Sequence, residues 1–241
     1  MPESMPCADS ASAILLDIEG TTTPVSFVFD VLFPFARDHA EQFLATRGHD
    51  ADVQSDLALL RQEYALEVEP APEWGGDDPV RAVPYVHFLI GCDRKSTALK
   101  SLQGKIWHTG YQSGQLKSQL FADVLPAFER WQAAGKDLYI FSSGSIQAQK
   151  LIFQYSQFGD LTPYLSGYFD TTTGPKKEVN SYQKIADAIG HPPEKILFIS
   201  DVVAELEPAK NAGFQTLFSQ RPGNLVDHPE SFTQITDFNP V

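Results

Sequence analysis

Short apolar runs alternate with helical patterns through the second half of the chain, and this rhythm constrains the fold more than any other feature. The runs lie at Leu138–Phe141, Tyr164–Phe169, Ile196–Ile199 and Gln215–Phe218, and helices are predicted between them at Gln147–Tyr155, Ser181–Ile189 and Ala204–Asn211. Strands that alternate with helices form parallel sheets. The sequence therefore predicts an α/β fold with a doubly wound, Rossmann-like parallel sheet.

One further apolar run, Ala13–Leu16, stands far upstream of the others. The long stretch that follows it carries helical patterns such as Phe35–Leu44 and Ala51–Leu66, with a loop expected over Glu69–Pro84 because prolines and glycines gather there. A mainly helical insertion after the first strand explains this spacing. We expect a core domain made of residues 1–21 and 116–241 and a helical cap domain made of residues 22–115.

Charge and cysteine content limit the partners and the compartment. Lys and Arg total 18 against 31 Asp and Glu, and the net charge of −13 disfavours nucleic acid and anionic membrane surfaces as partners. Cys7 and Cys92 show neither a disulfide framework nor metal-binding spacing, which is typical of a reducing cytoplasm. No stretch approaches the ~20 apolar residues of a membrane span, and no basic segment of an export signal is found. We expect a cytoplasmic monomer that acts on a small molecule.

The first apolar run leads directly into two acids, Asp17 and Glu19, followed by Gly20. A carboxylate can attack phosphorus to form an acyl phosphate, and a second acid can protonate the leaving oxygen and later activate water. The same residues also suit a strand end followed by an ordinary turn. Taken alone, this pattern leaves both interpretations open.

Three later strands also end in polar residues. Ser142 and Ser143 begin an SSGS segment, which suits either an anion site or the start of a helix. Lys176 and Lys177 follow the next strand, and either of them offers a cation for a phosphate or is a solvated turn residue.

The strand Ile196–Ile199 is followed by Asp201, with Glu205 four residues further on. Asp17 and Asp201 with a backbone carbonyl suit Mg²⁺, which prefers oxygen ligands and keeps several waters. Asp201 is also suited to capping a helix. The order of the strand ends favours the functional interpretation, because ligands of open parallel sheets bind beyond the carboxyl ends of the strands.

The order of DxEGT, SSGS, a lysine and an ISD segment resembles the haloacid dehalogenase-like hydrolases over most of the chain. The resemblance implies that Asp17 is the nucleophile and that Glu19 is the acid and base, with its backbone carbonyl on the metal. It further implies Mg²⁺ as cofactor, held by Asp17, Glu19 and Asp201, and phosphate binding by Ser142, Ser143 and Lys176.

A closer resemblance is to the enolase-phosphatases of methionine salvage, also called acireductone synthases, in which a glutamate at position 19 is normal. It rests on LLDIEGTTTPVSFVFDVLFPFAR, LQGKIWHTGYQSGQLKSQLFADVLPAF, FSSGSIQAQKLIF and KILFISDVVAELEPAK. It implies that a diketone phosphate is enolised and then dephosphorylated to the acireductone, and that Lys177 is not needed for phosphate binding.

Several alternatives stay open. Glu19 argues against a dehalogenase or a phosphonatase, whereas a phosphatase or mutase for another small metabolite, such as a sugar phosphate, is the main competitor. An inactive binding module would keep the fold but would be free to lose the acids and the lysine. In the insertion, Lys105 and His108 are candidates for binding the diketone or for proton transfer, or else are surface or hinge residues.

Overall fold

The computed structural model describes residues 10–94, 96–224 and 231–241, so Cys7 lies outside the described residues. The chain forms two compact units. The core unit holds the chain up to Val28 and again from Lys117 onward, and the cap unit holds Phe29–Leu116. The domain boundaries predicted after residues 21 and 115 stay a prediction, and the structural division falls slightly later at both ends. No helix in the described ranges is long and apolar enough to cross a membrane.

A six-stranded parallel sheet forms the centre of the core unit, with the strand order β3-β2-β1-β4-β5-β6. The strands are β1 (Ala13–Leu16), β2 (Asp137–Phe141), β3 (Gly167–Phe169), β4 (Ile196–Ser200), β5 (Gln215–Ser219) and β6 (Gln234–Ile235). The predicted doubly wound parallel sheet is confirmed. Since β1 lies between β2 and β4, the chain reverses its direction of winding there, and the carboxyl ends of these three strands meet at one edge.

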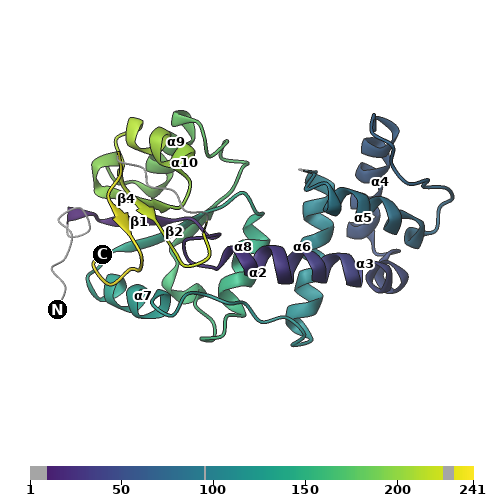
Figure 1. Ribbon diagram of the computed structural model, residues 1–241, viewed down its shortest axis with the longest axis horizontal. Coiled ribbons are helices and arrows are strands. Elements are labelled where there is room, and N and C mark those ends of the chain that lie inside the picture. Colours follow the sequence, from purple (N-terminus) through teal and green to yellow (C-terminus); the bar gives the residue numbers. More distant parts are fainter. Residues whose placement is uncertain (1–9, 95, 225–230) are drawn as a thin grey trace. The chain divides into compact units, whose positions relative to one another are not determined.

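Helices cover both faces of this sheet, with α9 and α10 on one side and α7 on the other (Figure 1). The helices of the core unit are α2 (Val25–Phe27), α7 (Val124–Ala133), α8 (Ile146–Gln154), α9 (Val179–Ile189) and α10 (Val203–Asn211), with short 3-10 turns η3 (Thr162–Tyr164) and η4 (Pro193–Lys195). Every residue of β1 and β4 is buried, as expected for strands with helices on both faces.

Two predictions for the core unit need correction. The apolar run Tyr164–Phe169 is not one strand, because its first residue closes the 3-10 turn η3, where Pro163 sets the backbone angle, and only Gly167–Phe169 pairs with β2. Strand β6 was not predicted, since a two-residue strand shows no periodicity.

The cap unit is helical, as predicted. The π-helix η1 (Val28–Leu32) begins at the last residue of the first core segment and continues into the cap unit. The other elements of the cap unit are α3 (Phe33–Arg47), α4 (Ala51–Ala65), the 3-10 turn η2 (Pro79–Ala82), α5 (Val83–Gly91) and α6 (Thr97–Gln112). The loop predicted over Glu69–Pro84 is wrong at its end, because Pro79 and Pro84 lie in the first turns of η2 and α5, where proline is well tolerated.

Lys105 and His108 lie within α6. The Lys105 ammonium binds the buried Asp56 carboxylate and the Asp52 carbonyl, both on α4. This lysine therefore joins two helices of the cap unit.

Candidate active site

A pocket of about 600 Å³ opens at the carboxyl ends of the central strands of the core unit. It is lined by Asp17, Glu19, Val25, Ser142, Ser143, Lys176, Asp201, Val202, Val203, Ala204, Glu205 and Gly223. All six site residues predicted from the sequence thus lie around one space, brought there by the four segments that follow β1, β2, β3 and β4. Their chemical roles stay predictions.

Asp17 follows β1 and is almost completely buried. Its Oδ1 accepts a hydrogen bond from its neighbour's backbone, Ile18 N, at 2.8 Å, and lies 2.7 Å from the Lys176 ammonium. Two donors on one oxygen fix the plane of this carboxylate. A fixed, lysine-bound carboxylate at a pocket wall is a suitable nucleophile.

Lys176 carries the positive charge of the pocket lining, and its side chain is 8% exposed. Its Nζ contacts Glu205 Oε2 at 2.5 Å as well as Asp17. Burial acts to lower the pKa of Lys176, but the attraction of the two carboxylates outweighs burial and raises it. The lysine therefore stays charged, whereas the adjacent Lys177 is exposed and lies outside the pocket lining.

Helix α9 holds the loop that presents this lysine. The Tyr182 hydroxyl donates to the Lys176 carbonyl at 2.7 Å, and the Ser181 hydroxyl donates to the Pro175 carbonyl at 2.7 Å. Both side chains are buried. Sequence reasoning missed these two residues, because nothing in a helical pattern marks which polar side chains point back to the preceding loop.

The serines after β2 occupy two different places, the start of helix α8 and the wall of the pocket. Ser145 is the N-cap of α8 and accepts a hydrogen bond from Ala148 N, which leaves Ser142 and Ser143 on the pocket wall. Gln149 is buried and its amide donates to the Gly144 carbonyl at 2.8 Å. The helix-start interpretation thus applies to Ser145, and phosphate binding by Ser142 and Ser143 stays a prediction.

The acids of the pocket outnumber its buried cation. Burial first, and then repulsion from Asp17 and Glu205, raise the pKa of Asp201 to about 7. Burial and Asp17 also raise the pKa of Glu205, against the attraction of Lys176. Since one ammonium cannot balance the four acids of the lining, Asp17, Glu19, Asp201 and Glu205, the pocket has negative charge to offer a further cation.

The described residues contain no group of three or more His, Cys, Asp or Glu side chains placed to hold a metal ion. A divalent cation here would therefore take two carboxylates, those of Asp17 and Asp201, and complete its shell with backbone carbonyl, substrate and water oxygens. This donor set fits Mg²⁺, which is commonly bound through only one or two carboxylates. The Glu205 carboxylate binds Lys176 and the Ser200 hydroxyl, as the Asp17 carboxylate also does, so the choice of Asp17 and Asp201 follows the family resemblance.

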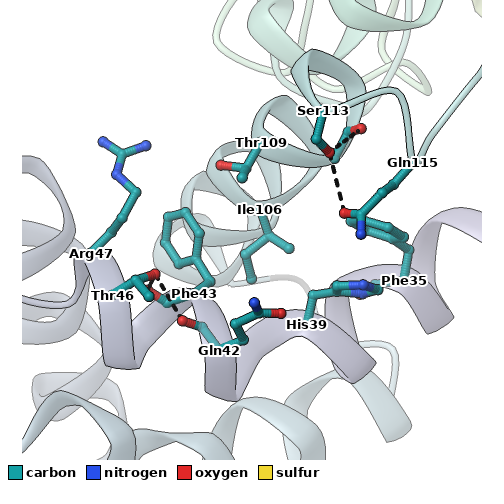
Figure 2. Close-up of a pocket in the computed structure, with 11 residues that line it drawn as sticks. Phe35, His39, Gln42, Phe43, Thr46, Arg47, Ile106, Thr109, Ser113 and Gln115 are labelled. Atoms are coloured by element: carbon teal, nitrogen blue, oxygen red, sulfur yellow. Dashed lines mark hydrogen bonds between the residues drawn. The ribbon is translucent and has the colours of Figure 1, made fainter.

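The cap unit has a pocket of its own, about 340 Å³, between α3 and α6 (Figure 2). Phe43 and Ile106 supply apolar surface, and the Thr46 and Ser113 hydroxyls donate to backbone carbonyls at 2.8 Å and 3.1 Å. No Asp or Glu is among the described residues that line it. The chemistry expected from the sequence therefore fits the core pocket and not this one.

Comparison with known proteins agrees with this chemistry. The family model of the haloacid dehalogenase-like hydrolases matches residues 11–213. The chain is 61% identical to enolase-phosphatase E1 of Synechococcus elongatus over 98% of this chain and 99% of that protein. It is 44% identical to a probable bifunctional methylthioribulose-1-phosphate dehydratase/enolase-phosphatase E1 of Vitis vinifera, over 96% of this chain and 47% of that protein.

Among solved structures, the crystal structure of the UTR4 protein from Saccharomyces cerevisiae superposes with a TM-score of 0.78 at 34% identity. The match covers 96% of this chain and all of that one.

Gly20 provides a test of the pocket geometry. Its φ is +67°, and a Cβ there would lie 2.1 Å from Asp201 Oδ2. Gly135 is the matched control, because its φ is +72° and a Cβ added there would have no neighbouring atom within 4 Å. Gly20→Ala and Gly135→Ala should each lose ~1–2 kcal/mol of stability through left-handed backbone strain. Only Gly20→Ala displaces Asp201, and its kcat/KM for p-nitrophenyl phosphate should fall about 10²-fold.

Denaturant unfolding and initial rates measure the two effects separately. Equal activity of the two variants would show that Gly20 serves only the turn.

Proposed function

The chain belongs to the haloacid dehalogenase-like hydrolases and, within them, to the enolase-phosphatase E1 proteins, and from this we propose its reaction. It converts 2,3-diketo-5-methylthiopentyl-1-phosphate to the acireductone 1,2-dihydroxy-3-keto-5-methylthiopentene and phosphate, a step of methionine salvage. The observation that carries the proposal is the buried pairing of Asp17 with Lys176 at 2.7 Å, in a pocket that also holds Glu19 and Asp201.

The name of the Vitis vinifera relative supports the substrate class. That protein combines an enolase-phosphatase with a dehydratase for methylthioribulose-1-phosphate. Loss of water from neighbouring hydroxyl-bearing carbons of a ketose phosphate yields an enol that becomes a second ketone. The product is a methylthio diketone phosphate, which is the substrate proposed for this chain.

In the proposed mechanism, Asp17 attacks phosphorus and the bond from phosphorus to the substrate oxygen breaks. Glu19 gives its proton to that leaving oxygen, and then accepts a proton from the water that hydrolyses the acyl phosphate. Ser142 and Ser143 donate hydrogen bonds to the phosphate oxygens. Lys176 keeps Asp17 oriented and offsets part of the negative charge in both steps.

Mg²⁺ is the proposed cofactor, with Asp17 and Asp201 as carboxylate ligands and Glu19 contributing its backbone carbonyl. When bound, the ion offsets the repulsion between an attacking carboxylate and a phosphate dianion, and it polarises the diketone.

The purified chain should release phosphate from the diketone phosphate with a far higher kcat/KM than from a panel of sugar phosphates, measured at saturating Mg²⁺. A pocket built for one small phosphate ester discriminates through the transition state, so the difference should appear in kcat/KM. Preference for a sugar phosphate would favour the competing phosphatase or mutase function.

The two adjacent lysines should differ sharply. Lys176→Met removes the buried ammonium but keeps most of the apolar stem, and kcat/KM should fall about 10²-fold or more, the usual effect of losing one preorganised charge partner. Lys177→Met is the matched control and should behave like the wild type, because Lys177 is exposed. The opposite ranking would place the phosphate lysine one residue later.

Asp17→Asn should separate the two chemical steps. The amide is nearly isosteric with the carboxylate but a poor nucleophile, so phosphate release should stop, while enolisation uses a different base and continues at excess Mg²⁺. Phosphorus NMR and ultraviolet absorbance should show the enol phosphate accumulating.

Phosphate release near the wild-type rate would exclude Asp17 as the nucleophile. Absence of the enol despite demonstrated binding of metal and substrate would show that Asp17 also takes part in the proton transfer.

A further inference from the structure

The segment Arg221–Asn224, directly after β5, contacts the turn that follows Asp17. The Arg221 guanidinium donates from Nε to the Thr21 carbonyl at 3.0 Å and from Nη1 to Asp123 Oδ2 at 2.8 Å. Its side chain is 1% exposed and lies 4.2 Å from the centre of the Phe238 ring. A cation this deeply buried stays in place only where its partners are fixed, so Arg221 anchors the segment to the turn.

Asn224 contacts the same turn at Gly20, the residue before Thr21. Its Nδ2 lies 2.9 Å from the Gly20 carbonyl and 3.3 Å from the Ser219 carbonyl. The same nitrogen lies 3.2 Å from Asp201 Oδ2. All three partners are acceptors, so the nitrogen and not the oxygen of the amide must face them.

Asp201 is thereby held from two sides. Gly20 leaves no space for a side chain, since a Cβ would lie 2.1 Å from Asp201 Oδ2 and 2.9 Å from Asn224 Nδ2. The backbone of Gly20 restricts the Asp201 carboxylate on one side. The Asn224 amide binds Oδ2 of the same carboxylate. The carboxylate thus has a defined position next to Asp17.

We propose that Asn224 is a positioning residue that holds the Asp201 carboxylate in place for a divalent cation; this inference rests on the Mg²⁺ requirement of the proposed function. The partner is a neutral amide and not an ammonium or guanidinium. A cationic partner would offset the charge of Asp201, whereas the amide adds no charge. An amide fixes the oxygen without placing a positive charge beside it.

The test compares Asn224→Ala with Ser219→Ala in the full chain. The Ser219 hydroxyl donates to the same Gly20 carbonyl, at 3.1 Å, but no contact of its side chain with Asp201 is present among the described residues. Both variants lose a hydrogen bond to the turn, and only Asn224→Ala loses the one to Asp201. Isothermal titration with MgCl₂, without substrate, gives the metal Kd, and thermal unfolding gives the stability of each variant.

Asn224→Ala should raise the Mg²⁺ Kd about 10- to 100-fold, the range for loss of a hydrogen bond to a metal ligand, while Ser219→Ala keeps the wild-type Kd. Saturating Mg²⁺ should restore most of kcat in Asn224→Ala. An unchanged Kd in Asn224→Ala, or an equal increase in both variants, would overturn the positioning role. If Asn224→Ala does not fold, Asn224→Ser is measured by the same criterion.

The wild type separates this inference from the proposed function. Wild-type protein that turns over the diketone phosphate but binds no Mg²⁺ would overturn both the metal requirement and the positioning role. Wild-type protein that binds Mg²⁺ but does not turn over the diketone phosphate would overturn the proposed function and leave the comparison of Kd values decisive.

Discussion

One ammonium shared between two buried carboxylates is the interaction on which the site depends. Lys176 binds Asp17 at 2.7 Å and Glu205 at 2.5 Å, and all three side chains are nearly inaccessible to water. Burying each ion costs several kcal/mol, and only close, well-oriented partners offset that cost. Loss of Lys176 would leave two uncompensated carboxylates close together in the interior. The fold must therefore hold all three in place together.

The parallel sheet meets this requirement through its topology. Asp17 follows β1, Glu205 lies in the first turn of α10 after β4, and Lys176 lies in the loop after β3. Pairing of β1 with β4 in register brings the first two together, and Asp17 N extends that pairing by donating to the Ile199 carbonyl at 3.0 Å. The lysine loop comes from further away and needs its own support, which Tyr182 and Ser181 supply from α9. The register of the sheet thus positions Asp17 and Glu205, and the hydrogen bonds from α9 position the loop that carries Lys176.

The sequence predicted what is encoded locally. Apolar runs marked β1, β2, β4 and β5, because a buried parallel strand is apolar on both faces, and polar residues after them marked the edge where the site lies. Contacts between distant residues were not predictable. The residues near Lys176 do not indicate that it, and not Lys177, is buried, and only the family resemblance favoured Lys176. Nothing near Asn224 indicates that its amide meets Gly20, which lies far away in sequence. Such contacts depend on which loops the folded sheet brings together.

The charge distribution explains how a protein of net charge −13 can bind a phosphate ester. Lys176 alone cannot attract the dianion, because Asp17 and Glu205 already balance its charge, and Asp201 adds a further acid to the pocket. Without another cation, the pocket would repel its proposed substrate. A divalent ion held by these carboxylates would offset that repulsion. On the proposed mechanism, the acidic pocket would hold a divalent ion that offsets its repulsion of a phosphate ester, and the amide of Asn224 suits this role because it adds no positive charge beside Asp201.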